Sequence, residues 1–170
     1  MVTRARIDRG ASVVIFAGLL ALIVDMFLGW VKVTVYSAGL FGTPLTIDMQ
    51  VIASGWSGWG IVGGILAVFL VFWHAWSLRG RRSSVGAAAV TVALAAATAG
   101  FTTWHALTGE ADVVGAEGTL LVTVTRLWPA EAAIGLTAAV AAAAVTRLVT
   151  AGAAVRSRAK GPSVAPSVNP

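Results

Sequence analysis

Acidic and histidine side chains within apolar segments are the residues of this sequence that could do chemistry. Asp25 lies in a long apolar run, about 20 Å from its start at Ala11 if the run is helical. A charged carboxylate at that depth of a membrane costs several kcal/mol unless it is protonated, paired or in contact with water. Asp25 is therefore expected to point toward other helices. The groups expected near it form a candidate intramembrane polar cluster: Asp25, Thr102, His105 and Glu131.

Two interpretations of this cluster are open. The first is an interhelical hydrogen bond or salt bridge that fixes helix packing, and we favour it because one carboxylate is little evidence for a site. The second is a proton- or ligand-binding site. In that case a line of threonines would extend it into a polar route that ends at His105: Thr91, Thr98 and Thr102.

The remaining ionisable groups predict no metal site, cofactor or catalytic centre. His74 falls about 20 Å or more from the level of His105 by helix rise, so the pair is not expected to bind one metal ion or haem. We interpret His74 as an interfacial histidine between Trp73 and Trp76, and Arg147 as a side chain that extends to the lipid headgroups. The chain has no cysteine, and it lacks zinc-protease, nucleophile-elbow, phosphate-loop and paired-carboxylate patterns.

The elements that must position these residues are four apolar segments long enough to cross a membrane. Of the 170 residues, 58% are hydrophobic and 11% are charged, whereas a soluble domain has about 25% charged residues. About 20 apolar residues span the hydrocarbon layer as a helix. The predicted spans are 11–30, 57–77, 86–106 and 128–149, and the predicted outer loops are 31–56 and 107–127. We expect an all-α transmembrane fold, an antiparallel four-helix bundle, in one membrane domain of residues 1–155.

The distribution of basic residues predicts the orientation of this bundle. Ten of the twelve Lys and Arg residues lie before the first span, between the second and third, or at the end of the fourth and beyond it, which leaves Lys32 and Arg126 for the other side. Because basic loops stay in the cytoplasm, we expect a multi-pass plasma-membrane protein with both termini cytoplasmic. The Pro/Ser-rich end predicts a disordered cytoplasmic tail, 156–170. Basic residues divided in this way predict no nucleic-acid partner.

Small residues within the spans are spaced for close packing of helices. Glycine and alanine four positions apart let two backbones approach each other in a membrane, and Gly60-x-x-x-Gly64 is one such pair. The residues expected to pack between helices are Ala21, Gly29, Gly60, Gly64, Gly100 and Gly135.

The outer loops have the alternating pattern of β-strands. Residues 31–36 and 45–51 alternate apolar and polar side chains around a turn that contains Gly42 and Pro44, and residues 119–125 alternate in the same way. Such runs predict a hairpin and a third strand. We favour a small extracytoplasmic sheet that caps the bundle over two separate flexible loops, because a third strand stabilises a hairpin. An open edge of such a sheet is a candidate surface for a partner strand.

The stretch Asp25-Met-Phe-Leu-Gly-Trp30, followed by the β-rich loop and by Ser54-Gly-Trp56, resembles small, uncharacterised four-helix membrane proteins of actinobacteria. Those proteins often carry Phe-Leu-Pro-Trp at the end of the first span and Ser-x-Trp before the second. Gly29 stands where they have proline. The resemblance covers roughly the first half of the chain and implies a plasma-membrane location without implying an activity. The layout is also similar to that of claudins, without their paired loop cysteines.

Our main functional hypothesis rests on two features of the sequence. It has many small residues suited to helix packing, and it predicts no catalytic centre. We expect a non-enzymatic accessory or scaffolding subunit that binds another membrane protein or a second copy of itself. The alternative is a small oligomeric transporter or channel that uses Asp25, the threonine line and His105 as a polar route. A membrane enzyme is the least favoured class, because one carboxylate and two distant histidines do not form an acid–base pair.

Overall fold

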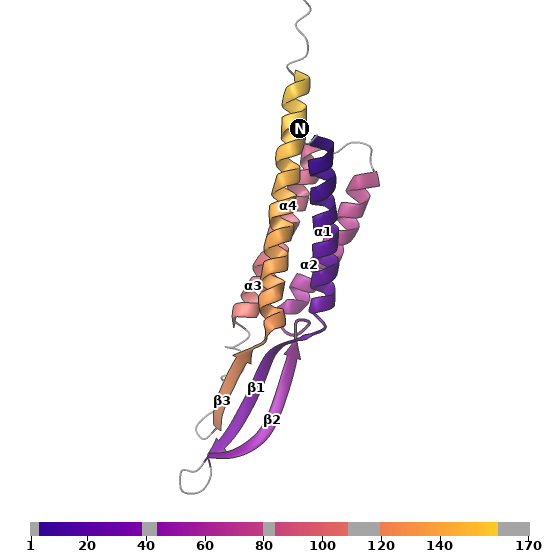
Figure 1. Cartoon of the computed structure of the whole chain (residues 1–170). Helices are drawn as coiled ribbons and strands as arrows, with labels where there is room; N and C mark the ends of the chain where they lie inside the picture. Colours follow the sequence, from indigo (N-terminus) through magenta and orange to yellow (C-terminus); the bar gives the residue numbers. More distant parts are fainter. Residues whose placement is uncertain (1–3, 39–43, 80–83, 109–119, 160–170) are drawn as a thin grey trace, which may run out of the picture.

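The described residues of the chain fold into four long helices and one small sheet (Figure 1). The computed structural model describes residues 4–38, 44–79, 84–108 and 120–159. In chain order the elements are α1 (Arg4–Asp25), β1 (Gly29–Ala38), β2 (Pro44–Ser54), α2 (Gly60–Arg79), α3 (Val85–Thr108), β3 (Leu120–Arg126) and α4 (Trp128–Ala159). Each of the four helices is long and apolar enough to cross a membrane.

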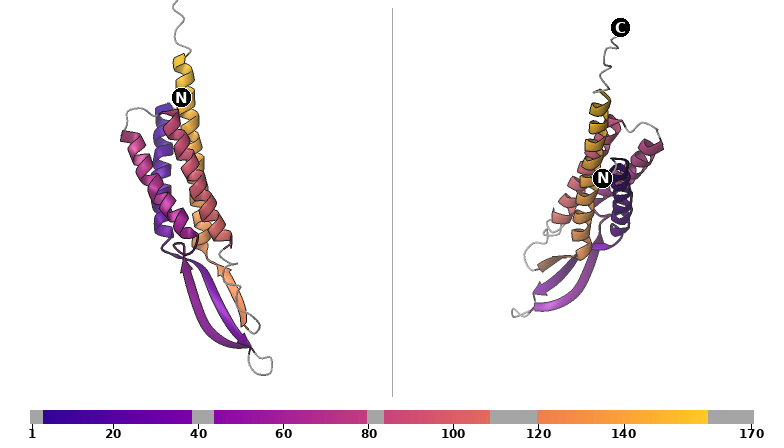
Figure 2. Two further views of the ribbon diagram at one scale, coloured as in Figure 1. Left: turned by 180° about the vertical axis from the view of Figure 1, so that it is seen from behind. Right: turned by 45° about the horizontal axis from the view of Figure 1, so that its top comes forward.

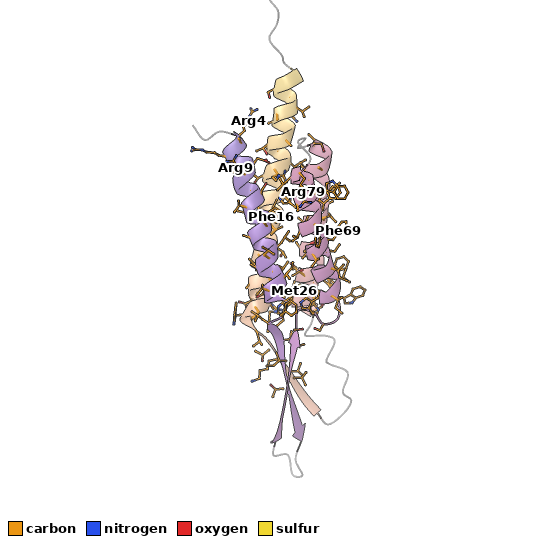
Figure 3. All side chains as sticks on the ribbon, turned by 90° about the vertical axis from the view of Figure 1, so that its right-hand side faces the viewer. Arg4, Arg9, Phe16, Met26, Phe69 and Arg79 are labelled. Carbon is orange, nitrogen blue, oxygen red and sulfur yellow. The ribbon has the colours of Figure 1, made fainter. Side chains whose placement is uncertain are left out.

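The helices lie side by side, and the sheet extends from one end of them (Figures 1 and 2). Helix α4 packs against α1 and α3, and α3 packs against α2, whereas α1 and α2 make far fewer contacts with each other. We refer to the end that carries the sheet as the sheet end and to the opposite end as the distal end. Figure 3 shows Arg4, Arg9 and Arg79 at the distal end and Met26 near the sheet.

Two helices differ from the predicted spans at their ends. Helix α1 runs from Arg4 to Asp25 rather than from 11 to 30, and α4 continues past residue 149 to Ala159. Hydropathy marks only the apolar part of a helix, whereas arginine and alanine favour helix in any surroundings. The predicted tail is therefore wrong for residues 156–159, which are helical, and its remainder, 160–170, lies outside the described residues.

The core between the two ends is apolar. Ile15, Leu19 and Leu22 of α1 and Leu70 of α2 are fully buried, and α4 contributes Val140. Their burial in one cluster with alanines of α3 and α4 shows that the helices are held together by close contacts of aliphatic side chains.

The sheet has three antiparallel strands in the order β2–β1–β3. This confirms the prediction that both outer loops join one sheet. Rows of apolar residues alternate with rows of polar residues across the strands, as in Val33–Val51–Val124 and Thr34–Gln50–Thr123. Strands β2 and β3 are its two edges.

Two of the predicted packing glycines lie inside the molecule. A Cβ atom on Gly60 would overlap the backbone oxygen of Gly55 and would lie 2.7 Å from Cδ2 of His105. A Cβ atom on Gly64 would lie 2.6 Å from Cη2 of Trp56. Only glycine therefore fits at Gly60 and Gly64 without a shift of the neighbouring groups.

The prediction that Ala21, Gly100 and Gly135 pack within the chain is wrong. All three are exposed, and a Cβ atom on Gly100 or Gly135 would have no neighbour within 4 Å among the described residues. Gly29 is not a helix-packing residue either, because α1 has already ended and Gly29 opens β1, where a Cβ atom would overlap the side chain of Ile52.

Two glycines that the spacing did not single out make close helix contacts instead. A Cβ atom on Gly18 would lie 2.7 Å from Cγ2 of Val140, at the contact between α1 and α4. A Cβ atom on Gly63 would lie 2.8 Å from Oγ1 of Thr102, at the contact between α2 and α3.

Candidate functional sites

Three members of the predicted polar cluster are buried at the sheet end. Asp25 is the last residue of α1, and Thr102 and His105 lie in the last two turns of α3. The side chain of Thr102 is fully enclosed, and those of Asp25 and His105 are almost so. We refer to these residues and Trp30 as the sheet-end cluster.

Trp30 connects α1 to α3 within the sheet-end cluster. Its side chain is buried, and its indole Nε1 donates a hydrogen bond to the backbone oxygen of Asp25 at 3.1 Å. The same ring packs on the imidazole of His105, with 5.8 Å between the ring centroids. Trp30 thus fills the junction between the helices and the sheet. Leu127 donates its backbone N–H to the Trp30 oxygen at 2.8 Å, which joins β3 to the same point.

Glycines of α2 and of the turn before it make room for the polar side chains of α3. His105 lies beside Gly60, and its Cε1 atom would be 3.7 Å from a Cβ atom on Gly58. Gly58 has a φ of 48°, which favours glycine. Thr102 lies against Gly63 in the same way. The glycine-rich start of α2 is therefore shaped around two polar groups.

Two oxygen atoms of the sheet-end cluster have no hydrogen-bond partner within the described part of the chain. These are Oδ2 of Asp25 and Oγ1 of Thr102. Buried polar atoms are nearly always paired, and these two oxygens are exceptions. The cluster is therefore able to form hydrogen bonds that the described residues do not supply.

Glu131 does not belong to the buried cluster. It lies in the first turn of α4, where it is exposed. Glu131 was included in the cluster because its expected depth in the membrane is similar to that of Asp25. Its side chain, however, is on the outward side of α4. A carboxylate there interacts favourably with the N-terminal end of the helix dipole.

A second polar cluster lies nearer the distal end and joins three helices. Arg147 of α4 donates from Nε to Oδ1 of Asp8 in α1 at 3.0 Å, and its Nη1 lies 3.0 Å from Nδ1 of His74 in α2. The side chain of Arg147 is 5% exposed and that of Asp8 is 36% exposed, while His74 is fully buried. We refer to these three residues as the distal cluster.

The geometry of the distal cluster defines the tautomer of the His74 imidazole. A guanidinium group has only donors, so Nδ1 of His74 accepts the hydrogen bond from Arg147. The proton of the neutral ring is then on Nε2, which has no partner among the described residues. The imidazole and the ring of Phe16 in α1 pack edge to face, with 4.9 Å between the centroids.

The distal cluster corrects two interpretations from sequence. Arg147 does not extend to headgroups and His74 does not lie at an interface, because both side chains are buried and in contact with each other. Asp8 was placed outside the first span, which was predicted to start at residue 11, but α1 already begins at Arg4 and therefore includes Asp8. The available signal was Arg147 itself, because a charge within a span normally requires a partner.

The predicted threonine line lies on the buried face of α3. Two of its three hydroxyl groups are engaged within their own helix: Thr91 donates to the backbone oxygen of Ala87 and Thr98 to that of Leu94, each at 2.9 Å. Thr91 and Thr98 therefore bond to the backbone, as threonines in helices commonly do, whereas Oγ1 of Thr102 has no partner among the described residues.

An aromatic-walled groove lies on the outward face of α3. Its volume is about 390 Å³, and its lining residues are Trp59, Ala97, Gly100, Phe101 and Trp104. The rings of Trp59 and Phe101 are stacked, with 6.4 Å between centroids and 22° between planes. Gly100 leaves its centre open, since nothing lies within 4 Å of its Cβ position. We refer to this feature as the α3 groove.

No protein-family model matches the chain, and no curated protein sequence matches it. Within the described ranges, no three His, Asp or Glu side chains are grouped so that they could hold a metal ion. The sites are therefore interpreted from their own geometry.

Proposed function

We propose that this chain is a multi-pass plasma-membrane protein whose helices cross the bilayer as an antiparallel bundle. Support comes from four sufficiently long apolar helices and from exposed tryptophans near both ends of the helices. Trp59, Trp104 and Trp128 are exposed at the sheet end, and Trp76 is exposed toward the distal end. Tryptophan concentrates at membrane interfaces because its ring is apolar and its N–H is polar. The plasma-membrane location follows the resemblance to the actinobacterial proteins.

The proposed orientation places the distal end in the cytoplasm and the sheet outside. It is supported by exposed arginines at the distal end, among them Arg4, Arg79 and Arg156. Short basic segments are retained on the cytoplasmic side during insertion.

Labelling of single cysteines tests this orientation, because the native chain has none. Thr125 in β3 and Ser157 near the end of α4 are both exposed. We expect Thr125→Cys to react with a membrane-impermeant maleimide in intact cells. Ser157→Cys should react only after the membrane is opened. The reverse pattern would contradict the orientation, and labelling of both in intact cells would contradict the membrane crossing.

We further propose that the protein is a non-enzymatic accessory subunit that binds a transmembrane helix of another membrane protein. The observation that carries this proposal is the α3 groove. A groove with small residues at its centre and aromatic walls suits a helix, since glycine and alanine let a second backbone come close.

Other outward-facing small residues support the same proposal. Gly135, Ala138 and Ala142 of α4 are exposed although they share one helix face, and no described residue lies within 4 Å of the Cβ position of Gly135. Lipid contact alone does not require small residues, whereas close contact between helices does. The open edges of the sheet offer a second contact outside the membrane.

Filling the α3 groove tests the proposal. Gly100→Leu adds a side chain where the chain itself leaves space, so we expect the folded protein to persist. We expect recovery of the partner after gentle detergent extraction to fall about tenfold or more, the effect of about 1.4 kcal/mol. The measurement is quantitative mass spectrometry of proteins that co-purify with the tagged chain.

Gly10→Leu is the matched control, because Gly10 is also exposed in a helix with no atom within 4 Å of its Cβ position. It should recover the partner as the wild type does. Full recovery with Gly100→Leu, or no partner with the wild type, would count against the proposal. If the protein recovered is a differently tagged copy of the same chain, the partner is a second copy.

The transporter alternative makes a different prediction. It requires proton or ion flux into reconstituted vesicles, and that flux should be lost in Asp25→Asn. The internal bonding of Thr91 and Thr98 favours the accessory subunit over this alternative.

A further inference from the structure

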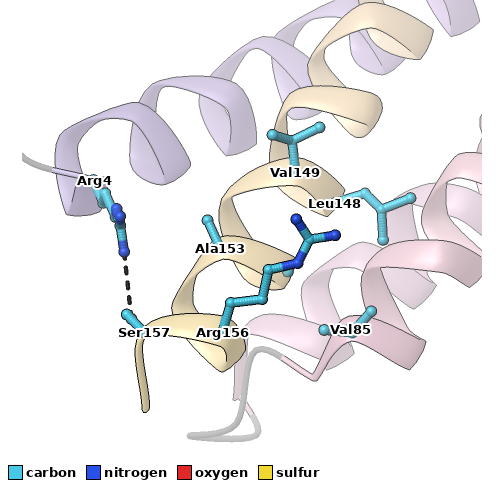
Figure 4. Close-up of a pocket in the computed structure, with 8 residues that line it drawn as sticks. Arg4, Val85, Leu148, Val149, Ala153, Arg156 and Ser157 are labelled. Atoms are coloured by element: carbon cyan, nitrogen blue, oxygen red, sulfur yellow. Dashed lines mark hydrogen bonds between the residues drawn. The ribbon is translucent and has the colours of Figure 1, made fainter. Parts of the chain in front are cut away.

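A second surface groove lies at the distal end, where α1, α3 and α4 meet (Figure 4). Its volume is about 750 Å³. The lining residues are Arg4, Val85, Leu148, Val149, Gly152, Ala153, Arg156 and Ser157. We refer to it as the distal groove. It shares no lining residue with the α3 groove.

The distal groove combines an apolar surface with two cationic side chains. Leu148, Val149 and Val85 form the apolar part, and Val149 is 64% exposed. Arg4 and Arg156 are both exposed, and the described lining contains no acidic residue. The nearby carboxylate of Asp8 is already bonded to Arg147. The groove thus has positive charge that no lining carboxylate neutralises.

The two arginines come from different helices. Arg4 begins α1, and its Nη1 donates to Oγ of Ser157 in the last turns of α4 at 3.5 Å. Arg156 extends over the groove from the same part of α4 (Figure 4). Arginine is well suited to bind phosphate oxygens, and the groove has one arginine from each of these two helices.

We propose that the distal groove binds an anionic phospholipid. The phosphate is held by Arg4 and Arg156, and an acyl chain lies along Val85, Leu148 and Val149. A free phosphate ion would use the arginines but not the apolar surface, whereas a phospholipid matches both parts. Basic pockets between helices at the cytoplasmic side are suited to such headgroups. This inference rests on the proposed membrane placement and not on the proposed protein partner.

Native mass spectrometry of the purified full-length chain in mild detergent tests the inference. We expect phosphatidylglycerol to bind at lower concentration than phosphatidylcholine. Arg156→Gln should weaken phosphatidylglycerol binding about fivefold, and Arg4→Gln with Arg156→Gln about 25-fold, as expected for about 1 kcal/mol per basic residue near a charged lipid surface. Arg79→Gln is the matched control, because Arg79 is an exposed arginine at the same end that does not line the groove.

A further variant tests the contribution of the groove itself without changing its charge. Gly152→Leu keeps both arginines and fills the groove at a position with no atom within 4 Å of the Cβ site. It should weaken binding of phosphatidylglycerol while leaving thermal unfolding of the lipid-free protein unchanged.

Three results would overturn the inference. These are equal binding of the two lipids, an equal loss with Arg79→Gln, and displacement of phosphatidylglycerol by millimolar inorganic phosphate. Gly100→Leu should bind the lipid normally, so failure of the partner proposal and failure of the lipid proposal are distinguishable.

Discussion

Replacing Asp8 with alanine is expected to lower the free energy of unfolding by about 3–5 kcal/mol, the usual cost of leaving a buried charge without its partner. The side chain of Arg147 is 5% exposed, and its Nε atom lies 3.0 Å from Oδ1 of Asp8. Without the carboxylate, His74 remains its contact in the distal cluster, and a neutral imidazole does not balance a positive charge. The measurement is reversible unfolding of the detergent-solubilised protein in a denaturing detergent titration.

Two further variants test whether the loss of stability in Asp8→Ala comes from the unpaired charge of Arg147 or only from the lost contact. Arg147→Met removes the charge and keeps an unbranched side chain of similar reach. Asp8 is then left alone, but at 36% exposure it is able to reach water. We expect a cost of about 1–2 kcal/mol. The double variant should be more stable than Asp8→Ala alone. If Asp8→Ala cost no more than Arg147→Met, the ion pair would not be formed in the protein.

Replacing Gly60 with alanine is expected to destabilise the sheet end by about 3 kcal/mol, at the upper end of the usual cost of overpacking. The added methyl group would overlap the backbone oxygen of Gly55 and would lie 2.7 Å from Cδ2 of His105. A backbone oxygen cannot rotate away as a flexible side chain does. The loss should appear as a lower unfolding temperature, together with a changed fluorescence of the buried Trp30.

The control for Gly60 is Gly135→Ala in α4. That position is exposed, and its Cβ site has no neighbour within 4 Å. Alanine is favoured over glycine in a helix by up to about 1 kcal/mol, so this variant should be neutral or slightly stabilising. Similar stability of the two variants would mean that α2 and the turn at Gly55 do not meet as described.

The helices and the sheet were predictable because their signals are local. Each span is a long apolar run, and a helix of that length is required wherever such a run crosses lipid. The strands were recognised by alternation within a few residues of Val33 and Val124. Even the third strand was found, because its pattern matches the hairpin it joins.

The inward and outward faces of the helices were not predictable from the same signals. In a soluble helix, polar residues mark the outer face. In an apolar helix both faces are apolar, so Gly64 and Gly100 have similar sequence surroundings. The structure places Gly64 against Trp56 and leaves Gly100 open. Only the positions of the neighbouring helices decide which glycine faces inward and which faces outward.

The distal cluster was missed for a different reason. Arg147 is 139 residues from Asp8 and 73 residues from His74 along the chain. Each residue alone has an ordinary explanation as a charge or an imidazole near a membrane surface. Only the packing of α1 and α4 around His74 reveals that the three belong together.

Each strand of the sheet is joined to a helix by a short connection. Residues 26–28 link α1 to β1, residues 55–59 link β2 to α2, and Leu127 alone links β3 to α4. Such short connections allow little movement between a strand and its helix. Trp30 also links the base of the sheet to α1 and to the end of β3. A molecule that pulls or tilts the strands would therefore act directly on α1, α2 and α4.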